Sequence, residues 1–380
     1  MTQEDRAQRI AGRATEAGTA RYRQRYEGRC AADHFSKRGD LWLSSIGIGT
    51  YLGEPDPRDD RAYAAAVALA LRSGCNVVDT AVNYRFQRSE RAVGAALADA
   101  LSGGEIARDE FVVATKGGFI PFDGGYPENP AAWFRDALLS PGIAAPDEVV
   151  ANCHIMTPRY LDAQIEWSRR NMGLETIDIY YVHNPETQLA EVARSEFLMR
   201  IKAAFEMLER AAADGRIGVY GVATWDGLRA GPDDPGYLSL KELLAAAEQA
   251  GGPNHRFRAI QLPVNLFMTE ALLEQNQKSG ERRASLLEAA ADAGMTVMSS
   301  GSLLQGQVLR AMGTAFDRII PGLATNAQRG LHMVRSAPGL ATALVGMKSA
   351  AHVQENLATA AVPRMSAEEV LSLMRSIRRT

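Results

Sequence analysis

Short runs of apolar residues alternate with longer stretches of mixed polarity from Ser45 onward. The runs are rich in β-branched residues, which is typical of strands that a parallel sheet buries on both faces. Strands are therefore predicted at residues 46–50, 76–78, 111–115, 177–182, 217–223, 259–262, 295–298 and 342–345.

Helical signals fill the stretches between these runs. Thr157 and Pro158 read as an N-cap followed by proline at the first helical position, and Gly74, Gly215 and Gly294 stand where helices would end. Helices are predicted at residues 61–72, 90–100, 158–172, 201–214, 240–250, 282–293 and 327–334. A strand followed by a helix, repeated along the chain, predicts an α/β fold of the (β/α)8 TIM barrel type.

Three segments lie outside this alternation. Residues 1–33 are predicted to form an N-terminal helical extension, and residues 34–380 the barrel domain. The mixed-sign charges of the extension favour a solvated helix packed on the barrel over an interaction arm. A hairpin is expected at residues 35–43, turning at 38–40. A long loop, residues 117–156, follows the third strand.

Composition excludes several classes of protein. The net charge of −3 and the pI near 6.1 provide no field that would attract nucleic acid or an anionic membrane. Cys30, Cys75 and Cys153 share no close spacing, which argues against a disulfide framework or a metal site and for a reducing, cytoplasmic location. No apolar run reaches the roughly 18 residues of a membrane span, and no signal peptide is visible.

Ionisable side chains stand just past three of the predicted strands. Asp79 follows the second strand, Lys116 the third and His183 the fourth, while Tyr84 lies five residues beyond Asp79. Active sites of TIM barrels lie at the C-terminal ends of the strands, so these groups should converge. Each alone is more often a turn residue or a core histidine, but their combination in adjacent strands indicates function.

A glycine-rich stretch, Gly47 to Gly53, offers a competing interpretation. With Asp79 ending the next strand, it looks like a dinucleotide-binding loop of a doubly wound fold. In that motif a helix begins at once, so that its N-terminus meets the pyrophosphate. Here Pro55 and Pro57 delay the helix, which makes this alternative the weaker one.

Several motifs together resemble the aldo-keto reductases. They are Asp79-Thr80-Ala81 with Tyr84, Ser89-Glu90, Lys116 after Val-Val-Ala-Thr, Ile-Asp-Ile-Tyr-Tyr-Val before His183-Asn-Pro, Gly221-Val222, Gln261 with Asn265, and Gly346 through Glu355-Asn356. The resemblance covers roughly residues 41 to 360. It implies a (β/α)8 barrel that uses NADPH, with NADH as the second option, to reduce aldehydes and ketones. It also implies that Asp79, Tyr84, Lys116 and His183 are the catalytic residues.

The chemistry of these four groups fits carbonyl reduction. Hydride arriving at a carbonyl carbon leaves negative charge on oxygen, so the site needs a proton donor there. Tyr84 can donate the proton, and Lys116 beside it favours the phenolate. Asp79 would hold Lys116, and a neutral His183 would orient the carbonyl oxygen.

The resemblance also implies a set of cofactor-binding residues. Gln261 would meet the nicotinamide amide, residues 303–306 the pyrophosphate, residues 346–349 a phosphate, and Glu355 with Asn356 the adenine. The full predicted set is Thr50, Thr224, Gln261, Ser302, Leu303, Gly306, Gly346, Lys348, Ser349, Glu355 and Asn356. Because residues 352 and 354 are His and Gln, Lys348 is the main argument for NADPH over NADH.

Other positions depart from the family pattern. Ala223-Thr224 stands where many relatives have Ser-Asn, and Ser300 stands where an aromatic residue often stacks on the nicotinamide. These departures keep an alternative open, a non-catalytic or regulatory nucleotide-binding barrel. The aromatic residues of the loop 117–156 predict a lid over a large or apolar small-molecule substrate, with a subunit contact in a homo-oligomer as the alternative.

Overall fold

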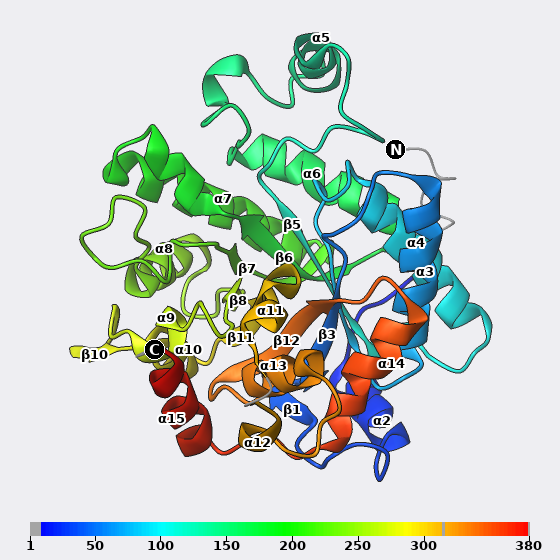
Figure 1. The fold of residues 1–380 in the computed structure, drawn as a ribbon. Coiled ribbons are helices and arrows are strands. Elements are labelled where there is room, and N and C mark those ends of the chain that lie inside the picture. The colour runs from blue at the N-terminus through cyan, green and yellow to red at the C-terminus, as the bar shows by residue number, and fades with distance from the viewer. Residues whose placement is uncertain (1–8, 314–315, 379–380) are drawn as a thin grey trace.

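Eight parallel strands close into a barrel in the computed structural model, which describes residues 9–313 and 316–378 (Figure 1). Their order around the barrel follows the chain. The strands are β3 (Ile46–Gly49), β4 (Val77–Asp79), β5 (Val112–Gly117), β6 (Ile177–His183), β7 (Ile217–Ala223), β8 (Phe257–Pro263), β11 (Thr296–Ser300) and β12 (Leu340–Gly346). The predicted (β/α)8 barrel is thereby confirmed, and the doubly wound alternative is wrong.

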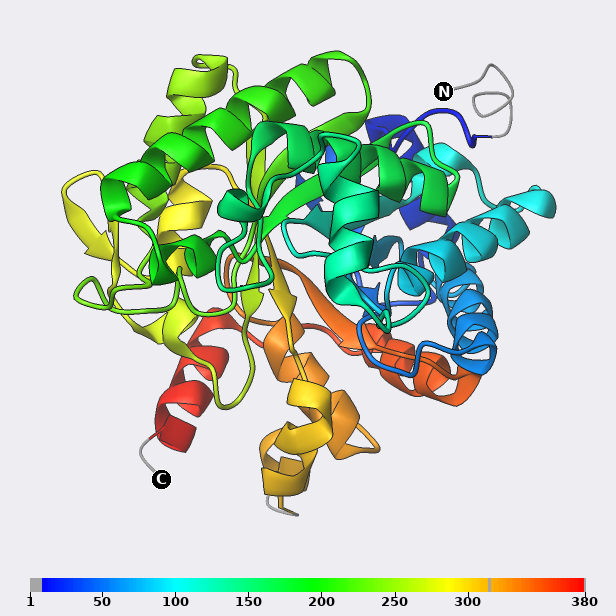
Figure 2. The same ribbon diagram turned by 90° about the horizontal axis from the view of Figure 1, so that it is seen from above.

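Helices surround the strands on all sides (Figure 2). The larger ones are α3 (Pro57–Leu71), α4 (Arg88–Ser102), α6 (Pro158–Met172), α7 (Arg194–Ala213), α8 (Leu240–Gly251), α10 (Leu286–Asp292), α13 (Asn326–Arg335), α14 (Ala350–Ala358) and α15 (Ala367–Arg378). Short ones are α9 (Glu270–Leu273), α11 (Gln307–Ala311) and α12 (Phe316–Ile319), and the 3-10 turns η4 (Pro185–Ala190), η5 (Leu304–Gly306) and η6 (Thr359–Ala361).

The helix predicted at 282–293 is wrong at its beginning. Residues Arg282–Ala284 form β10, which pairs with β9 (Gln277–Ser279) across a turn at Gly280. The helix starts only after Ser285, whose side chain accepts a hydrogen bond from the Glu288 amide in a capping box.

The N-terminal extension is helical over a shorter range than predicted. The helix α2 covers Glu16–Arg25; residues 1–8 of the predicted helix lie outside the described residues. Thr15 caps the start of α2, and Gly12 before it has a φ of +85°. Ile10 lies outside the helix and forms a parallel bridge to Leu174. Helix α2 packs on the barrel, since the buried Tyr22 hydroxyl donates to the Leu71 carbonyl over 2.6 Å.

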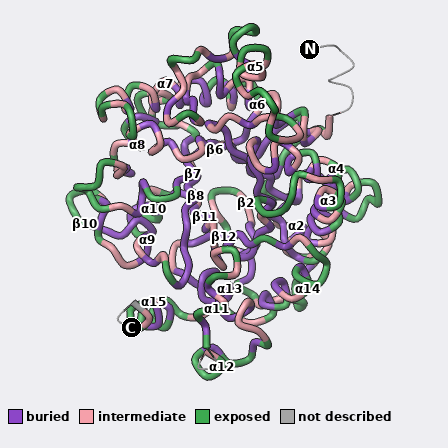
Figure 3. Tube along the Cα trace, turned by 45° about the horizontal axis from the view of Figure 1, so that its top comes forward, coloured by how far each residue is buried: buried purple, intermediate pink, exposed green. Residues whose placement is uncertain are grey.

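The hairpin predicted at 35–43 is formed by β1 (Phe35–Arg38) and β2 (Leu41–Ser44). Leu43 of this hairpin and Ala14 pack against the inward-facing apolar residues of the barrel, among them Val77 and Ile179. Figure 3 shows the strands buried and the outer parts of the helices exposed. The barrel is therefore closed at its N-terminal end and filled by apolar side chains.

Alternation along the strands decides which residues reach the other end. Every second residue of a strand faces the interior. In β4, Val77 is inward and so is Asp79; in β6, Tyr181 is inward and so is His183. In these two strands a polar inward residue thus stands at the C-terminal end, above a layer of inward-facing side chains.

Close contact between β7 and β8 depends on a glycine. A Cβ at Gly221 would lie 1.9 Å from the Ala259 carbonyl oxygen. We expect Gly221→Ala to lower the free energy of unfolding by about 3 kcal/mol, because the backbones would have to separate. Urea denaturation would measure this. Gly231→Ala is the control, since Gly231 is exposed and has nothing within 4 Å. Equal effects of the two substitutions would contradict the prediction.

Three features concern the chain as a whole. Across residues 9–313 and 316–378, no helix combines the length and the apolar character needed to cross a membrane. In the same residues no three His, Cys, Asp or Glu side chains are grouped so as to hold a metal ion. Cys30, Cys75 and Cys153 are free thiols.

Candidate active site

Four ionisable side chains meet at the C-terminal end of the barrel. The Lys116 Nζ lies 2.7 Å from Asp79 Oδ2 and 4.8 Å from the centre of the Tyr84 ring. The rings of Tyr84 and His183 are 5.8 Å apart and nearly perpendicular. The structure therefore brings together all four residues that the sequence singles out.

The turn after β4 holds Tyr84 in a defined place. The next three residues, Arg85 to Gln87, all have positive φ, between 50° and 68°. Such a run in non-glycine residues is costly and persists only where the surroundings fix it. Here the Arg85 guanidinium, itself buried, donates to the Glu54 carbonyl over 2.9 Å and forms an ion pair with Asp60.

The ammonium of Lys116 is buried and makes two hydrogen bonds. It donates to Asp79 Oδ2 and, over 2.8 Å, to the Thr80 carbonyl. The other oxygen of Asp79 accepts from Gln261 Nε2 over 2.7 Å. Burial opposes the charge on Lys116, but the neighbouring Asp79 and Tyr84 outweigh it and raise the pKa of the ammonium above its ordinary value. Lys116 is thus a permanent cation.

Tyr84 and His183 are both neutral near pH 7. Burial raises the pKa of Tyr84, and the Lys116 charge offsets only part of that rise. Lys116 pulls the phenol toward ionisation, as the sequence predicts, but burial is the larger effect. Burial, with the Lys116 charge, keeps the pKa of His183 well below its ordinary value. The His183 Nδ1 is buried without a hydrogen-bond partner among the described residues.

A cavity of about 760 Å³ lies above these groups. Asp79, Tyr84 and His183 are in its wall, whereas Lys116 lies beneath it. Nearly all the predicted cofactor residues also line it: Thr50, Thr224, Gln261, Ser302, Leu303, Gly306, Gly346, Glu355 and Asn356.

Two predicted cofactor residues are not in the cavity wall. Lys348 Nζ pairs with Asp59 Oδ2 over 2.7 Å, and Ser349 Oγ caps α14 by accepting from the His352 amide. The hydrogen bond from Lys348 lowers the pKa of Asp59 to about 2. The carboxylate therefore stays charged and competes for the ammonium that was expected to meet a phosphate.

Comparison with known proteins relates the first half of the barrel to one family. Residues 45–230 match the model of the aldo/keto reductase family. Over these residues, just under half of the chain, the sequence is similar to the aldo/keto reductases. The curated D-threo-aldose 1-dehydrogenase of Pseudomonas sp is 30% identical over 166 residues, 44% of each chain. The NADH-specific methylglyoxal reductase of Escherichia coli is 26% identical over 192 residues, 49% of this chain and 50% of the relative. The matched region thus spans about half the length of these curated relatives.

Solved structures extend the likeness in fold to most of the chain. An aldo/keto reductase from Klebsiella pneumoniae, in complex with NADP and acetate, superimposes with a TM-score of 0.59 and 20% identity. The superposition covers 90% of this chain and 95% of the other. At this identity the likeness concerns the barrel fold.

The cavity suits a polar ligand. Thr224 Oγ1, Asn356 Oδ1 and Asn83 Oδ1 are buried in or beside its wall without hydrogen-bond partners in the described part of the chain. Buried polar atoms nearly always have a partner, so these three point to a bound polar group. Ala223 and Ser300 also line the cavity, and Ala223 brings no polar side chain.

Two aromatic wall residues were missed by the sequence analysis. Tyr51 packs edge-on against Tyr84, with ring centres 5.0 Å apart. Trp225 follows β7 and is 40% exposed, and its amide donates to Glu186 Oε1 over 2.7 Å. Their position directly after strand-like runs was an available signal, because those loops form the rim of a barrel.

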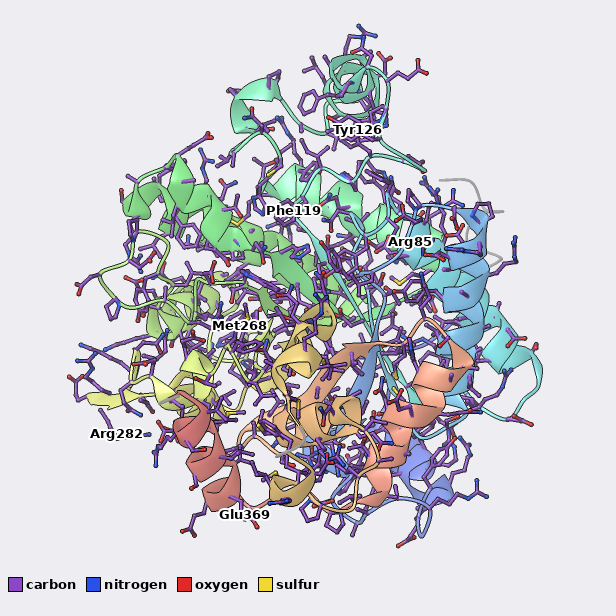
Figure 4. The ribbon with its side chains drawn as sticks, in the orientation of Figure 1. Arg85, Phe119, Tyr126, Met268, Arg282 and Glu369 are labelled. Atoms are coloured by element: carbon purple, nitrogen blue, oxygen red, sulfur yellow. The ribbon has the colours of Figure 1, made fainter. Side chains whose placement is uncertain are left out.

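The loop 117–156 packs mainly beside the cavity. It contains the short helix α5 (Pro130–Phe134), and its Leu138 and Ile155 form a small core with Tyr160 of α6. Figure 4 shows Tyr126 near α5 and Phe119 closer to the barrel. Phe119 is the residue of this loop that lines the cavity in the described structure. The aromatic content predicted an ordered segment correctly, while a lid over the cavity remains a prediction that rests on Phe119.

Proposed function

We propose that this chain is an NAD(P)H-dependent oxidoreductase that reduces an aldehyde or ketone to an alcohol, with Tyr84 as the proton donor. The main support is the convergence of a neutral phenol, a buried ammonium and a neutral imidazole at one cavity. The names of relatives support it further: one is a methylglyoxal reductase specific for NADH, another an aldose dehydrogenase, and one solved structure contains NADP.

A nicotinamide cofactor, when bound, supplies the hydride for this reaction. Gln261 and Thr224 near the catalytic groups would hold the nicotinamide end, and Glu355 and Asn356 the adenine end. The hydroxyl of Thr224 and the amide of Asn356 have free hydrogen-bonding capacity for this purpose.

Residues of this chain donate the proton and stabilise the negative charge that forms during the reaction. The Tyr84 hydroxyl donates its proton to the carbonyl oxygen as negative charge develops there. Lys116 stabilises the phenolate left behind, and Asp79 keeps that ammonium in place. The uncharged His183 ring lies beside Tyr84 and can orient the same oxygen by hydrogen bonding.

Aromatic side chains complete the site. Tyr51, Phe119 and Trp225 line the cavity and form apolar walls around a small-molecule carbonyl substrate. Such walls exclude water, which strengthens each electrostatic interaction inside.

Fluorescence titration with NADPH and NADH, followed by assays with a panel of aldehydes and ketones, tests the proposal. We expect binding of at least one cofactor and its oxidation in the presence of a carbonyl compound. A regulatory barrel is the second candidate, since Ala223 removes a polar group from the wall. Binding without oxidation across the whole panel would favour that alternative.

Asp59 offers a prediction about cofactor preference. None of the described residues that line the cavity is Lys or Arg, and the nearby Lys348 is paired with Asp59. We expect Asp59→Asn to raise the affinity for NADPH relative to NADH by about fivefold, because the ammonium is released toward a 2′-phosphate.

The dissociation constants of both cofactors, measured by fluorescence, would show this change. NADH serves as the internal control, since it lacks the 2′-phosphate and its affinity should hardly change. The asparagine can still accept the hydrogen bond that Asp59 receives from the Glu54 amide. An unchanged ratio would show that the pair does not affect discrimination.

A further inference from the structure

The two ends of the loop 117–156 are joined beside β6. Phe119 and His154 form an antiparallel bridge, and the Ile155 amide donates to the Gly118 carbonyl over 2.8 Å. A Cβ at Gly118 would lie 2.6 Å from His154 Nε2, so the glycine allows the ring to approach. This stem places the buried His154 directly behind the end of β6.

His154 makes a hydrogen bond to the backbone of His183. Its Nε2 lies 2.7 Å from the His183 carbonyl oxygen, and its Nδ1 lies 2.9 Å from Gln188 Nε2. The Gln188 Oε1 accepts from Arg200 over 2.7 Å, which assigns the other amide atom as the donor to His154. Since a carbonyl can only accept, Nε2 carries the hydrogen. Each hydrogen bond in this series therefore has one donor and one acceptor. The series runs from Arg200 through Gln188 and His154 to the carbonyl of His183.

The end of β6 needs such support. Asn184 follows His183 with φ of 44° and ψ of 58°, and it precedes Pro185. This left-handed conformation is unfavourable for a residue before proline. The His183 ring packs against the rings of Tyr84 and Phe119, and its centre is 4.9 Å from that of the nearly perpendicular Phe119 ring. Phe119 in turn packs against His154 at 5.2 Å.

We infer that His154 is a positioning residue: through its hydrogen bond to the His183 carbonyl and its contact with Phe119, it fixes where the His183 imidazole meets the substrate carbonyl. This inference rests on the proposed function for the role of His183. It assigns a role in the reaction to the loop 117–156, which contributes Phe119 to the cavity wall and His154 behind it.

His154→Leu removes the hydrogen bond, and His34→Leu is the matched control. His34 is equally buried, and its ring also bonds a backbone carbonyl, that of Gly74 over 2.9 Å, but it lies next to Ser45 at the start of β3. Burial lowers the pKa of each of these two histidines to about 4, so both are neutral near pH 7. Both variants should lose stability, while His154→Leu alone should lower kcat, by about tenfold to a hundredfold, with cofactor affinity unchanged.

His154→Gln provides the rescue, because its side-chain amide can place a donor near the position of Nε2. Its kcat should stay within about threefold of the parent, whereas the shorter His154→Asn should fall by about tenfold or more. This pair replaces His154→Leu in the test should that variant not fold. Equal kcat losses in His154→Leu and His34→Leu, or no difference between His154→Gln and His154→Asn, would overturn the inference.

Nuclear magnetic resonance of 15N-labelled histidine separates this inference from the proposed function. The chain has 6 histidines, and His183→Gln identifies the signals of His183. We expect the His183 ring signals to shift or broaden in His154→Leu and to stay unchanged in His34→Leu. A parent protein without reductase activity would refute the proposed function. Unperturbed His183 signals in His154→Leu would refute the positioning role.

Discussion

Tyr84→Phe is expected to lower kcat for carbonyl reduction by about a thousandfold, the scale of a lost general acid. The hydroxyl is the group placed to donate a proton, while the ring supplies the packing against Tyr51 and His183. Phenylalanine keeps this packing and removes only the hydroxyl. The dissociation constant of the cofactor should therefore change little, and steady-state kinetics combined with fluorescence titration would separate the two effects.

Tyr180→Phe is the control for this substitution. Tyr180 is fully buried outside the cavity wall, and its hydroxyl has no hydrogen-bond partner in the described residues. Its loss should leave kcat nearly unchanged. Comparable kcat values for Tyr84→Phe and the parent would show that another group donates the proton.

The proton-donor role of Tyr84 also predicts in which direction kcat changes with pH. Reduction requires the protonated phenol, and burial raises the pKa of Tyr84. Activity should therefore persist as the pH rises and fall only when the pH passes through this raised pKa. In Tyr84→Phe the residual activity should lack this alkaline decrease. A decrease at the same pH in both proteins would assign it to another group.

The strands and their ends could be predicted from the sequence because each strand of a buried parallel sheet appears as a short run of apolar residues. The run at 177–182, for example, is apolar apart from Asp178 and stops where His183 begins. Strand β6 has nearly the same bounds, Ile177–His183. Side chains alternate between the two faces of a strand, and this alternation places His183 inside the barrel. The same run of residues therefore predicts both the strand and the position of a site residue.

The incorrect elements have weaker local signals. Arg282–Ala284 lies next to a genuine helix, and a pairing of three residues with β9 does not leave a clear periodicity. The N-terminal extension has polar and small residues that allow a helix, but Gly12 and the cap at Thr15 limit it to α2. Tertiary contacts such as the bridge of Ile10 to Leu174 decide the rest.

Contacts between distant residues could not be predicted. Lys348 has a charge that suits a phosphate, but its partner Asp59 lies 289 positions away. Gln261 reaches Asp79 over a separation of 182 positions. Neither pairing follows from local sequence, since both depend on how the barrel closes between β12 and β3 and on which side chains meet inside it.

Lys116→Met is expected to lower the free energy of unfolding by about 3–5 kcal/mol, because it leaves a buried carboxylate without its cation. The Lys116 side chain is 1% exposed and that of Asp79 is 6% exposed, so both charges of the pair are buried. The Thr80 carbonyl also loses its donor. Activity should fall as well, since the Tyr84 phenolate formed during the reaction would no longer have a cation beside it.

Urea denaturation of Lys116→Met, Asp79→Asn and the double variant would measure the coupling within the pair. The double variant should be more stable than Lys116→Met, because Asp79→Asn removes the uncompensated charge. Lys202→Met is the matched control: its partner Glu206 is 2.9 Å away, but both side chains are 40% exposed. Breaking that surface pair should cost less than about 1 kcal/mol. An equal loss in the free energy of unfolding for Lys116→Met and Lys202→Met would contradict the prediction. It would show that the ion pair with Asp79 does not hold the ammonium next to Tyr84, as the proposed stabilisation of the phenolate requires.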